Sequence, residues 1–311
     1  MNKQIKIENN MSSGDLVVAC KGYNERLLAL SLIKQISHLC RDIQRHRGLG
    51  MSLIAGYEEF EPDFTSLQLQ VGRRMKALQA FSLQSNNLLS STQLEKLSAA
   101  WTVIERDWQG DSVMENFEYH SHFIEQLLQL MMNLARFLER PVATEFGESA
   151  PVATRNVEPR KQQINQVGLL VFVCNQLPSL VELVAKIRGL ATLAASRGSQ
   201  DELESSKLRY FIQGTRVQHE KVRSQADRLL EITRDAIRNL PLIKAYEFKL
   251  MFLLTTVEKE ILEPKLINMN SRQLFDLATE TIDVYLKVVD EGLTQLQLWQ
   301  EESLEQWFQY G

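Results

Sequence analysis

Two arginines occupy positions where a helix would normally carry apolar residues. Arg47 follows Cys40 and Ile43 at helical spacing, which places it on the apolar stripe of its helix. Arg188 falls in the same way on a later stripe, made by Leu177, Val181, Val184, Ala191 and Ala195. A guanidinium inside a helical bundle costs several kcal/mol unless a negative group meets it. Each arginine therefore predicts an anionic partner.

A glycine follows each arginine, and small residues surround both. Gly48 and Gly189 each cost about 1 kcal/mol in helix propensity relative to alanine. Without a Cβ, they allow another backbone or a ligand to come close. The neighbouring small side chains predict a compact pocket, and they are Ser52, Ala55, Thr192 and Ala195.

Two interpretations of these arginines are open. In the first, each pairs with an inward-facing Asp or Glu of a neighbouring helix, as buried charges commonly do. In the second, both meet one small anion, because the planar fork of guanidinium N–H donors suits a planar oxyanion.

The composition predicts an all-α protein with long helices. The chain has 311 residues, of which 44% are apolar and 24% charged, so global disorder is excluded. It holds only 14 Gly and 7 Pro, well below the roughly 12% of average usage. So few turn-forming residues favour long helices over many short strands.

Apolar periodicity predicts eight antiparallel helices in two groups of four. Residues 1–22 are expected to be a flexible segment, and 23–140 a first four-helix bundle. Residues 141–159, with three of the seven prolines, are expected to be a linker, and 160–311 a second bundle. The expected helices cover about 23–56, 64–87, 91–108, 113–140, 161–196, 201–239, 241–263 and 271–308.

A short internal repeat supports this duplicated plan. Arg-Gly-Leu occurs at 47–49 and again at 188–190, each time late in a long helix and followed by small residues. At similar spacing the next helix carries a glycine and an arginine, in Gly72-Arg73-Arg74 and Gly214-Thr215-Arg216. A pseudo-twofold arrangement would bring Arg47 and Arg188 to the junction of the halves, which favours the interpretation with one shared anion.

These paired helices, with Arg-Gly followed by small residues in two copies, resemble the NIT domain, the nitrate- and nitrite-sensing domain of bacterial regulators. The resemblance covers about residues 23–308. It implies two four-helix bundles with an arginine-lined nitrate or nitrite pocket where their long helices meet. By position it assigns ligand binding to Arg47, Arg188, Gly48 and Gly189, with Arg45, Arg74 and Arg216 as weaker candidates.

The resemblance also implies how such a protein would signal. Known NIT proteins continue into an output module, such as an RNA-binding antitermination domain, or lie within membrane receptors or kinases. The last expected helix finishes in an acidic and aromatic turn, Glu301 to Tyr310, and the chain ends directly after it. We therefore expect a soluble, cytoplasmic sensor without membrane or direct nucleic-acid binding, whose output passes through a partner protein. Homodimer formation is left open.

Other chemistry finds little support in the sequence. Three scattered cysteines form no disulfide framework or zinc motif, and His120 and His122 point to different sides of a helix. No catalytic motif is present, so we expect no enzyme, metal site or cofactor. The net charge of −4 argues against a nucleic-acid surface. The alternative function is a ligand-free helical scaffold that binds a partner protein, with both arginines in internal salt bridges.

Overall fold

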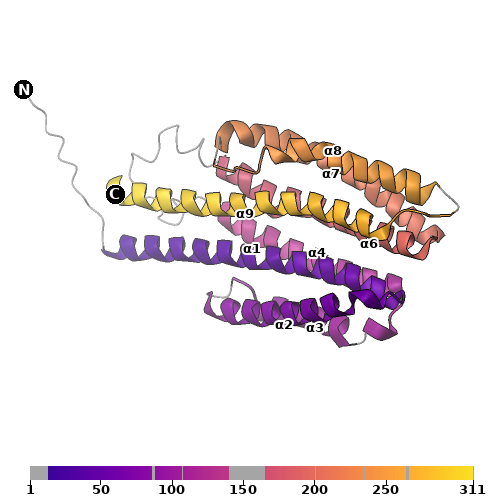
Figure 1. Ribbon diagram of the computed structural model, residues 1–311. Coiled ribbons are helices and arrows are strands. Elements are labelled where there is room, and N and C mark those ends of the chain that lie inside the picture. The colour runs from indigo at the N-terminus through magenta and orange to yellow at the C-terminus, as the bar shows by residue number, and fades with distance from the viewer. Residues whose placement is uncertain are drawn as a thin grey trace, which may run out of the picture.

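The computed structural model describes residues 13–310 except 86–87, 107, 140–164, 200, 234–235 and 264–265. Within these ranges it holds eight α-helices and no strand, so the predicted all-α class is confirmed (Figure 1). The expected linker at 141–159 lies outside the described residues.

The first group of helices comprises α1 (Ser13–Ile54), α2 (Glu61–Gln84), α3 (Ser91–Arg106) and α4 (Val113–Glu139). Short 3₁₀ turns at Glu58–Phe60 and Trp108–Gly110 precede α2 and α4. The start of α1 corrects one expectation, since residues 13–22, expected to be flexible, already form helix.

The second group begins with a helix over Asn165–Arg197, whose last part is α6 (Leu177–Arg197). It continues with α7 (Glu202–Thr233), α8 (Leu242–Thr256) and α9 (Ser271–Tyr310). A π-helical turn at Val257–Leu262 extends α8. The predicted helix over 201–239 was too long, because α7 ends at Thr233 and a turn leads into α8.

Polar caps fix several helix starts. At α3 and α4, Ser90 with Gln93 and Ser112 with Glu115 each exchange side-chain bonds with the other's backbone N–H. The N-cap of α3 is thus Ser90. Asn270 caps α9 by accepting from the backbone N–H of Gln273.

A π-helical turn at Phe172–Gln176 accommodates Pro178 within the helix. Proline lacks an N–H, and its ring clashes with the carbonyl four residues earlier, which here belongs to Cys174. The wider turn contains Cys174, and within it the N–H of Leu177 bonds to the carbonyl of Phe172. The helix therefore passes the proline without ending.

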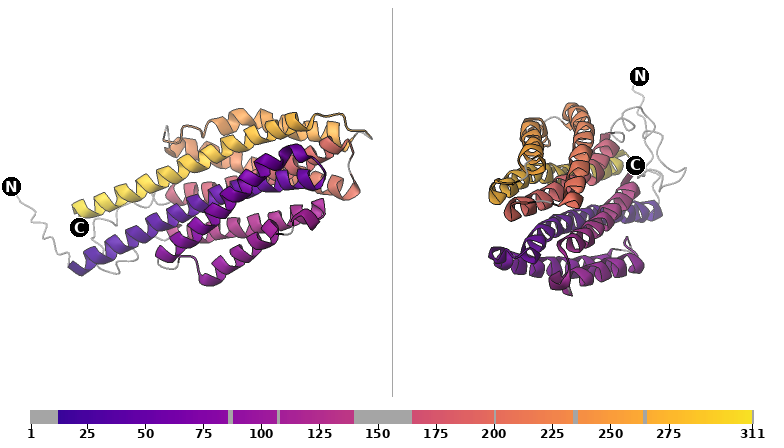
Figure 2. Two further views of the ribbon diagram at one scale, coloured as in Figure 1. Left: turned by 60° about the horizontal axis from the view of Figure 1, so that its bottom comes forward. Right: turned by 90° about the vertical axis from the view of Figure 1, so that its right-hand side faces the viewer.

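The two groups pack against each other along their longest helices. Helix α1 contacts α2 and α4 within its own group, and also α6 and α9 of the other group. Helix α6 in turn packs on α7 and α9. Figures 1 and 2 show α1 and α9 running side by side where the groups meet. One continuous hydrophobic core joins both groups, so the arginine-bearing helices α1 and α6 meet inside the fold.

The helix over Asn165–Arg197 has the length and apolar composition that could cross a membrane. In this structure 61% of its most apolar window is buried against neighbouring helices, as in the core helix of a globular protein. Its longest continuous apolar run, Val167 to Cys174, is followed by the polar residues Asn175 and Gln176.

Candidate functional site

Arg47 lies in the interior and forms a buried ion pair across the two groups. Its Nη1 donates to Glu182 Oε1 at 2.6 Å and to Ser121 Oγ at 2.9 Å, while Nη2 donates to Glu182 Oε2 at 3.3 Å. Its guanidinium carbon lies 5.2 Å from the centre of the Phe117 ring. Arg47 thus has the inward carboxylate partner that the first interpretation expected.

Arg188 is also buried, but its partners are neutral. Its Nη1 donates to Thr279 Oγ1 at 3.0 Å and its Nη2 to the backbone carbonyl of Gln44 at 3.4 Å, and the Phe275 ring stacks 4.9 Å away. Within the described ranges no carboxylate lies at ion-pair distance from it. Its Nε is buried with no hydrogen-bond partner there.

The charge state of Arg188 reflects this environment. Burial is the largest cause that lowers its pKa, and the positive charges of Arg47 and Arg45 act in the same direction. Against the opposing effect of Asp283 and Glu182, these causes together bring the pKa to about 9. The guanidinium therefore still carries its charge at neutral pH. It is a buried cation beside a second buried cation.

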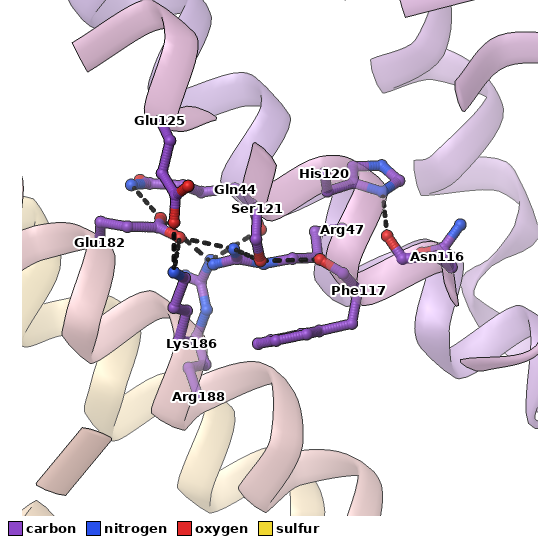
Figure 3. Close-up of polar contacts among 10 residues, drawn as sticks. All are labelled: Gln44, Arg47, Asn116, Phe117, His120, Ser121, Glu125, Glu182, Lys186 and Arg188. Atoms are coloured by element: carbon purple, nitrogen blue, oxygen red, sulfur yellow. Dashed lines mark hydrogen bonds and ion pairs between the residues drawn. The ribbon is translucent and has the colours of Figure 1, made fainter. Parts of the chain in front are cut away.

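Gln44 connects the two arginines, and Lys186 is a further partner of Glu182. The Gln44 side chain donates to Glu182 Oε2 at 2.9 Å, while the Gln44 backbone carbonyl accepts from Arg188. Lys186 Nζ lies 3.7 Å from Glu182 Oε1 and 3.2 Å from Glu125 Oε1. Figure 3 shows the Arg188 side chain rising toward Arg47 and Glu182 between α1, α4 and α6. We name this group the arginine cluster: Gln44, Arg47, Ser121, Glu182, Lys186, Arg188 and Thr279.

A polar group next to the arginine cluster also lacks a partner. Thr192 lies one turn after Arg188 on α6, and its buried Oγ1 makes no hydrogen bond within the described residues. Threonine hydroxyls in helices commonly bond to the carbonyl four residues earlier. The free Thr192 hydroxyl and the free Arg188 Nε thus lie on one face of α6 as two unused donors.

The structure separates the remaining candidates from this cluster. Arg45 is exposed, Arg74 pairs with Asp42 at 2.5 Å, and Arg216 makes two hydrogen bonds of 2.7 and 2.8 Å with Glu258. A Cβ added at Gly48 would meet nothing within 4 Å, so this glycine provides no close approach. At Gly189 the nearest atom to an added Cβ would be the Sδ of Met51 from α1 at 3.4 Å, an ordinary contact, so this glycine provides no close approach either.

Sequence reasoning missed the neutral and acidic members of the arginine cluster. Glu182 had a usable signal, because it is a lone carboxylate in the apolar segment that leads to Arg188. Gln44, Ser121 and Thr279 come from α1, α4 and α9, so only the tertiary packing brings them together. No spacing along the chain marks them.

A buried histidine pair lies near Arg47 on the same two helices. His120 Nδ1 bonds to the Asn116 carbonyl at 2.7 Å, so this nitrogen carries the proton. His46 Nδ1 lies 2.8 Å from His120 Nε2 and donates to it. Burial lowers the pKa of His120 to about 3, and burial together with His120 lowers the pKa of His46. Both rings are therefore neutral at physiological pH.

A cavity of about 230 Å³ lies away from the arginines, between α4 and the segment that leads into α3. Leu89, Leu130 and Phe137 line it together with other uncharged side chains. It offers no charge to an anion, so the arginine cluster remains the candidate site.

The fold itself is similar to that of a known regulator. A solved structure, described as "Structure of the NasR transcription antiterminator", superimposes with a TM-score of 0.66 at 15% sequence identity. The match covers 93% of this chain and 73% of that chain. This chain has a NIT-like helical fold. The fold implied by the sequence resemblance is thus confirmed. At 15% identity the likeness assigns no role to individual residues, so their roles are argued only from the geometry described above. No protein-family model and no curated protein sequence matches the chain.

Proposed function

We propose that the protein is a soluble, cytoplasmic regulator that senses nitrate or nitrite at the arginine cluster. The observation that carries this proposal is Arg188, a buried guanidinium without a carboxylate partner and with an unused Nε donor. Buried charges are normally compensated, and an anion at Arg188 would supply the missing charge.

The charge balance favours a monovalent anion. Lys186 of the cluster is balanced by Glu125 at 3.2 Å, and the remaining charged groups, Arg47, Arg188 and Glu182, leave one positive charge in excess. One nitrate or nitrite would neutralise it, whereas sulfate would reverse it. A planar oxyanion could accept from Arg188 Nε and from the Thr192 hydroxyl with two of its oxygens.

Glu182 gives this site a means of coupling to the helices. A carboxylate is planar and delocalised like nitrate, so Glu182 acts at Arg47 as an internal stand-in for the ligand. An anion that competes for Arg47 would release Glu182 toward Lys186, 3.7 Å away on the same helix. Because Arg47 and Glu182 join α1 to α6, ligand occupancy would shift the relative positions of these helices.

The output is proposed to pass through a partner protein rather than through chemistry or nucleic-acid binding by this chain. In the described residues no group is arranged as nucleophile and base around the arginine cluster, and the chain is acidic overall. Helix α6, which carries Arg188 and follows the π turn, is the element that we expect to move.

A ligand-free scaffold remains the second candidate, and the Arg47–Glu182 pair favours it. A completely buried pair of this kind can serve as structure alone, with no ligand involved. The scaffold does not account for the uncompensated charge of Arg188 or the unused Thr192 hydroxyl.

Calorimetric titration with nitrate, nitrite and chloride separates the two candidates. The sensor predicts nitrate or nitrite binding that Arg188→Ala abolishes and that Arg216→Ala, a matched control at a half-exposed ion pair, leaves unchanged. At about 100 times the dissociation constant, ligand should stabilise the protein by roughly 2.7 kcal/mol. Full nitrate affinity in Arg188→Ala would reject the site, and no binding by the unmodified protein would favour the scaffold.

A further inference from the structure

His219 is a second buried polar side chain that the fold leaves without partners. It lies on α7 between Thr215 and Val222, on the stripe that faces the core, and is 1% exposed. Neither ring nitrogen has a hydrogen-bond partner within the described residues. Leaving such groups unpaired costs about 1–3 kcal/mol, so an unmet imidazole in a core indicates a missing partner such as an ion or water.

Two carboxylates lie beside this imidazole. One ligand atom from each of His219, Glu220 and Glu247 can be chosen so that all three lie within 4.8 Å of one another. Glu220 follows His219 on α7, while Glu247 comes from α8. Ligand atoms bound to one ion at about 2.0–2.2 Å lie within that separation.

We infer that His219, Glu220 and Glu247 form a binding site for a divalent transition-metal ion of the zinc type. The imidazole nitrogen disfavours Mg²⁺ and Ca²⁺, which prefer oxygen ligands, and suits Zn²⁺, Co²⁺ or Ni²⁺. Glu220 is exposed, so water can complete the coordination from the solvent side. The ion would link α7 to α8 at a place separate from the arginine cluster.

The surroundings permit such binding. Burial lowers the pKa of His219, while the carboxylates of Glu247 and Glu220 act in the opposite direction. The ring is thus neutral near pH 7 and has a lone pair to offer. Arg223 donates to Glu220 Oε2 at 2.9 Å on the protein surface, so it must share or release one oxygen. An exposed ion pair of this kind contributes little, so it opposes metal binding weakly.

Titration of the full chain with Zn²⁺ and with Co²⁺ as a spectroscopic probe tests the site. We expect one ion per chain, a raised melting temperature, and no effect of Mg²⁺ at the same concentration. Glu247→Gln should weaken Zn²⁺ binding by more than about tenfold, as should His219→Gln. Glu231→Gln, which removes an exposed carboxylate from the same helix α7, should leave it unchanged.

Two results would overturn the inference. Equal Zn²⁺ affinity in Glu247→Gln and Glu231→Gln would show that the ion binds elsewhere. A thiolate-to-cobalt absorption band would assign it to a cysteine such as the exposed Cys20. Glu247→Gln alters a partly exposed side chain, so the test does not depend on whether the buried His219 tolerates substitution. Nitrate binding is measured independently, so either proposal can fail alone.

Discussion

Arg47 and Arg188 occupy equivalent positions in the repeat but meet different partners, and this difference predicts opposite mutational effects. Arg47→Ala would leave the Glu182 carboxylate buried with only the Gln44 amide and the more distant Lys186. We expect it to lower the free energy of unfolding by about 3–5 kcal/mol. Arg188→Ala removes an uncompensated charge and two bonds to neutral groups, so we expect a change within about 1 kcal/mol.

Urea denaturation of both variants without ligand measures this contrast. The double variant Arg47→Ala/Glu182→Gln should recover part of the loss, because it removes the stranded carboxylate as well. Equal losses in Arg47→Ala and Arg188→Ala would contradict the assignment of different partners.

The histidine pair His46–His120 predicts acid sensitivity. Burial lowers the pKa of both rings, so below about pH 6.5 the unfolded chain binds more protons than the folded one. The free energy of unfolding is therefore greatest above that pH and falls as the pH decreases. At pH 5 the His120 ring, whose pKa in the folded protein is about 3, accounts for a loss of about 2 kcal/mol at 1.36 kcal/mol per pH unit, and His46 adds to this loss.

Urea midpoints at pH 7.5 and pH 5 give the measurement for the pair. The glutamine of His120→Gln cannot titrate and can still donate to the Asn116 carbonyl, so the variant should lose the part of this pH dependence that His120 contributes. The control variant His122→Gln changes an exposed histidine two residues further along α4, and it should retain the full pH dependence. The same pH dependence in both variants would refute the role of the pair.

At the scale of single residues, the sequence predicted which side chains lie inside the fold but not which side chains they contact. Helical spacing placed Arg47 and Arg188 inside the bundle, and both are buried. It could not assign Glu182 to Arg47, because that contact joins residues from α1 and α6. The cluster of His219 and Glu220 with Glu247 was missed for the same reason, since two helices supply its atoms.

At the scale of elements, α9 makes an unusually close approach to the π turn at Phe172–Gln176. A Cβ added at Gly292 would lie 2.5 Å from Val173 Cγ1, and Val173 is fully buried. A β-branched side chain in a helix has one strongly preferred rotamer, so Val173 cannot easily turn away. We expect Gly292→Ala to destabilise the protein by about 1–3 kcal/mol.

Chemical denaturation with a matched glycine tests this contact. At Gly72 on α2 an added Cβ meets nothing within 4 Å, so Gly72→Ala should stabilise by up to about 1 kcal/mol through helix propensity. If Gly292→Ala proved as favourable as Gly72→Ala, the close approach of α9 to the π turn would be wrong.

The elements also show where periodicity succeeds and fails as a predictor. Long amphipathic stripes located all eight helices, because a buried face imposes a period of 3.6 residues. The first turns of α1, from Ser13, were missed because the apolar residues Leu16 to Cys20 form one continuous run without a helical stripe, with glycines at 14 and 22 on either side. The π turn was missed as well, although Pro178 marked the place, since the sequence does not say whether a helix kinks, ends or widens there.

At the scale of the whole molecule, the two groups of four helices share one hydrophobic core rather than two. The packing of α1 on α6 and α9 is reinforced by polar bonds between the groups. Arg47 pairs with Glu182 in the interior, and Arg41 pairs with Asp283 at 2.9 Å nearer the surface. Neither group can unfold without exposing apolar surface of the other. We therefore expect the two groups, which the sequence divides, to unfold together.

This shared core predicts a single cooperative unfolding transition for the whole chain. Differential scanning calorimetry should give one peak whose calorimetric and van't Hoff enthalpies agree.

Leu127→Ala on α4 and Leu250→Ala on α8 each create a cavity at a fully buried site, one in each group, at a cost of about 2–5 kcal/mol. If the core is common to both groups, either variant shifts the entire peak to lower temperature. If the groups are independent, each variant shifts only its own part and splits the peak in two. In that case anion binding between α1 and α6 could not act on the molecule as a unit.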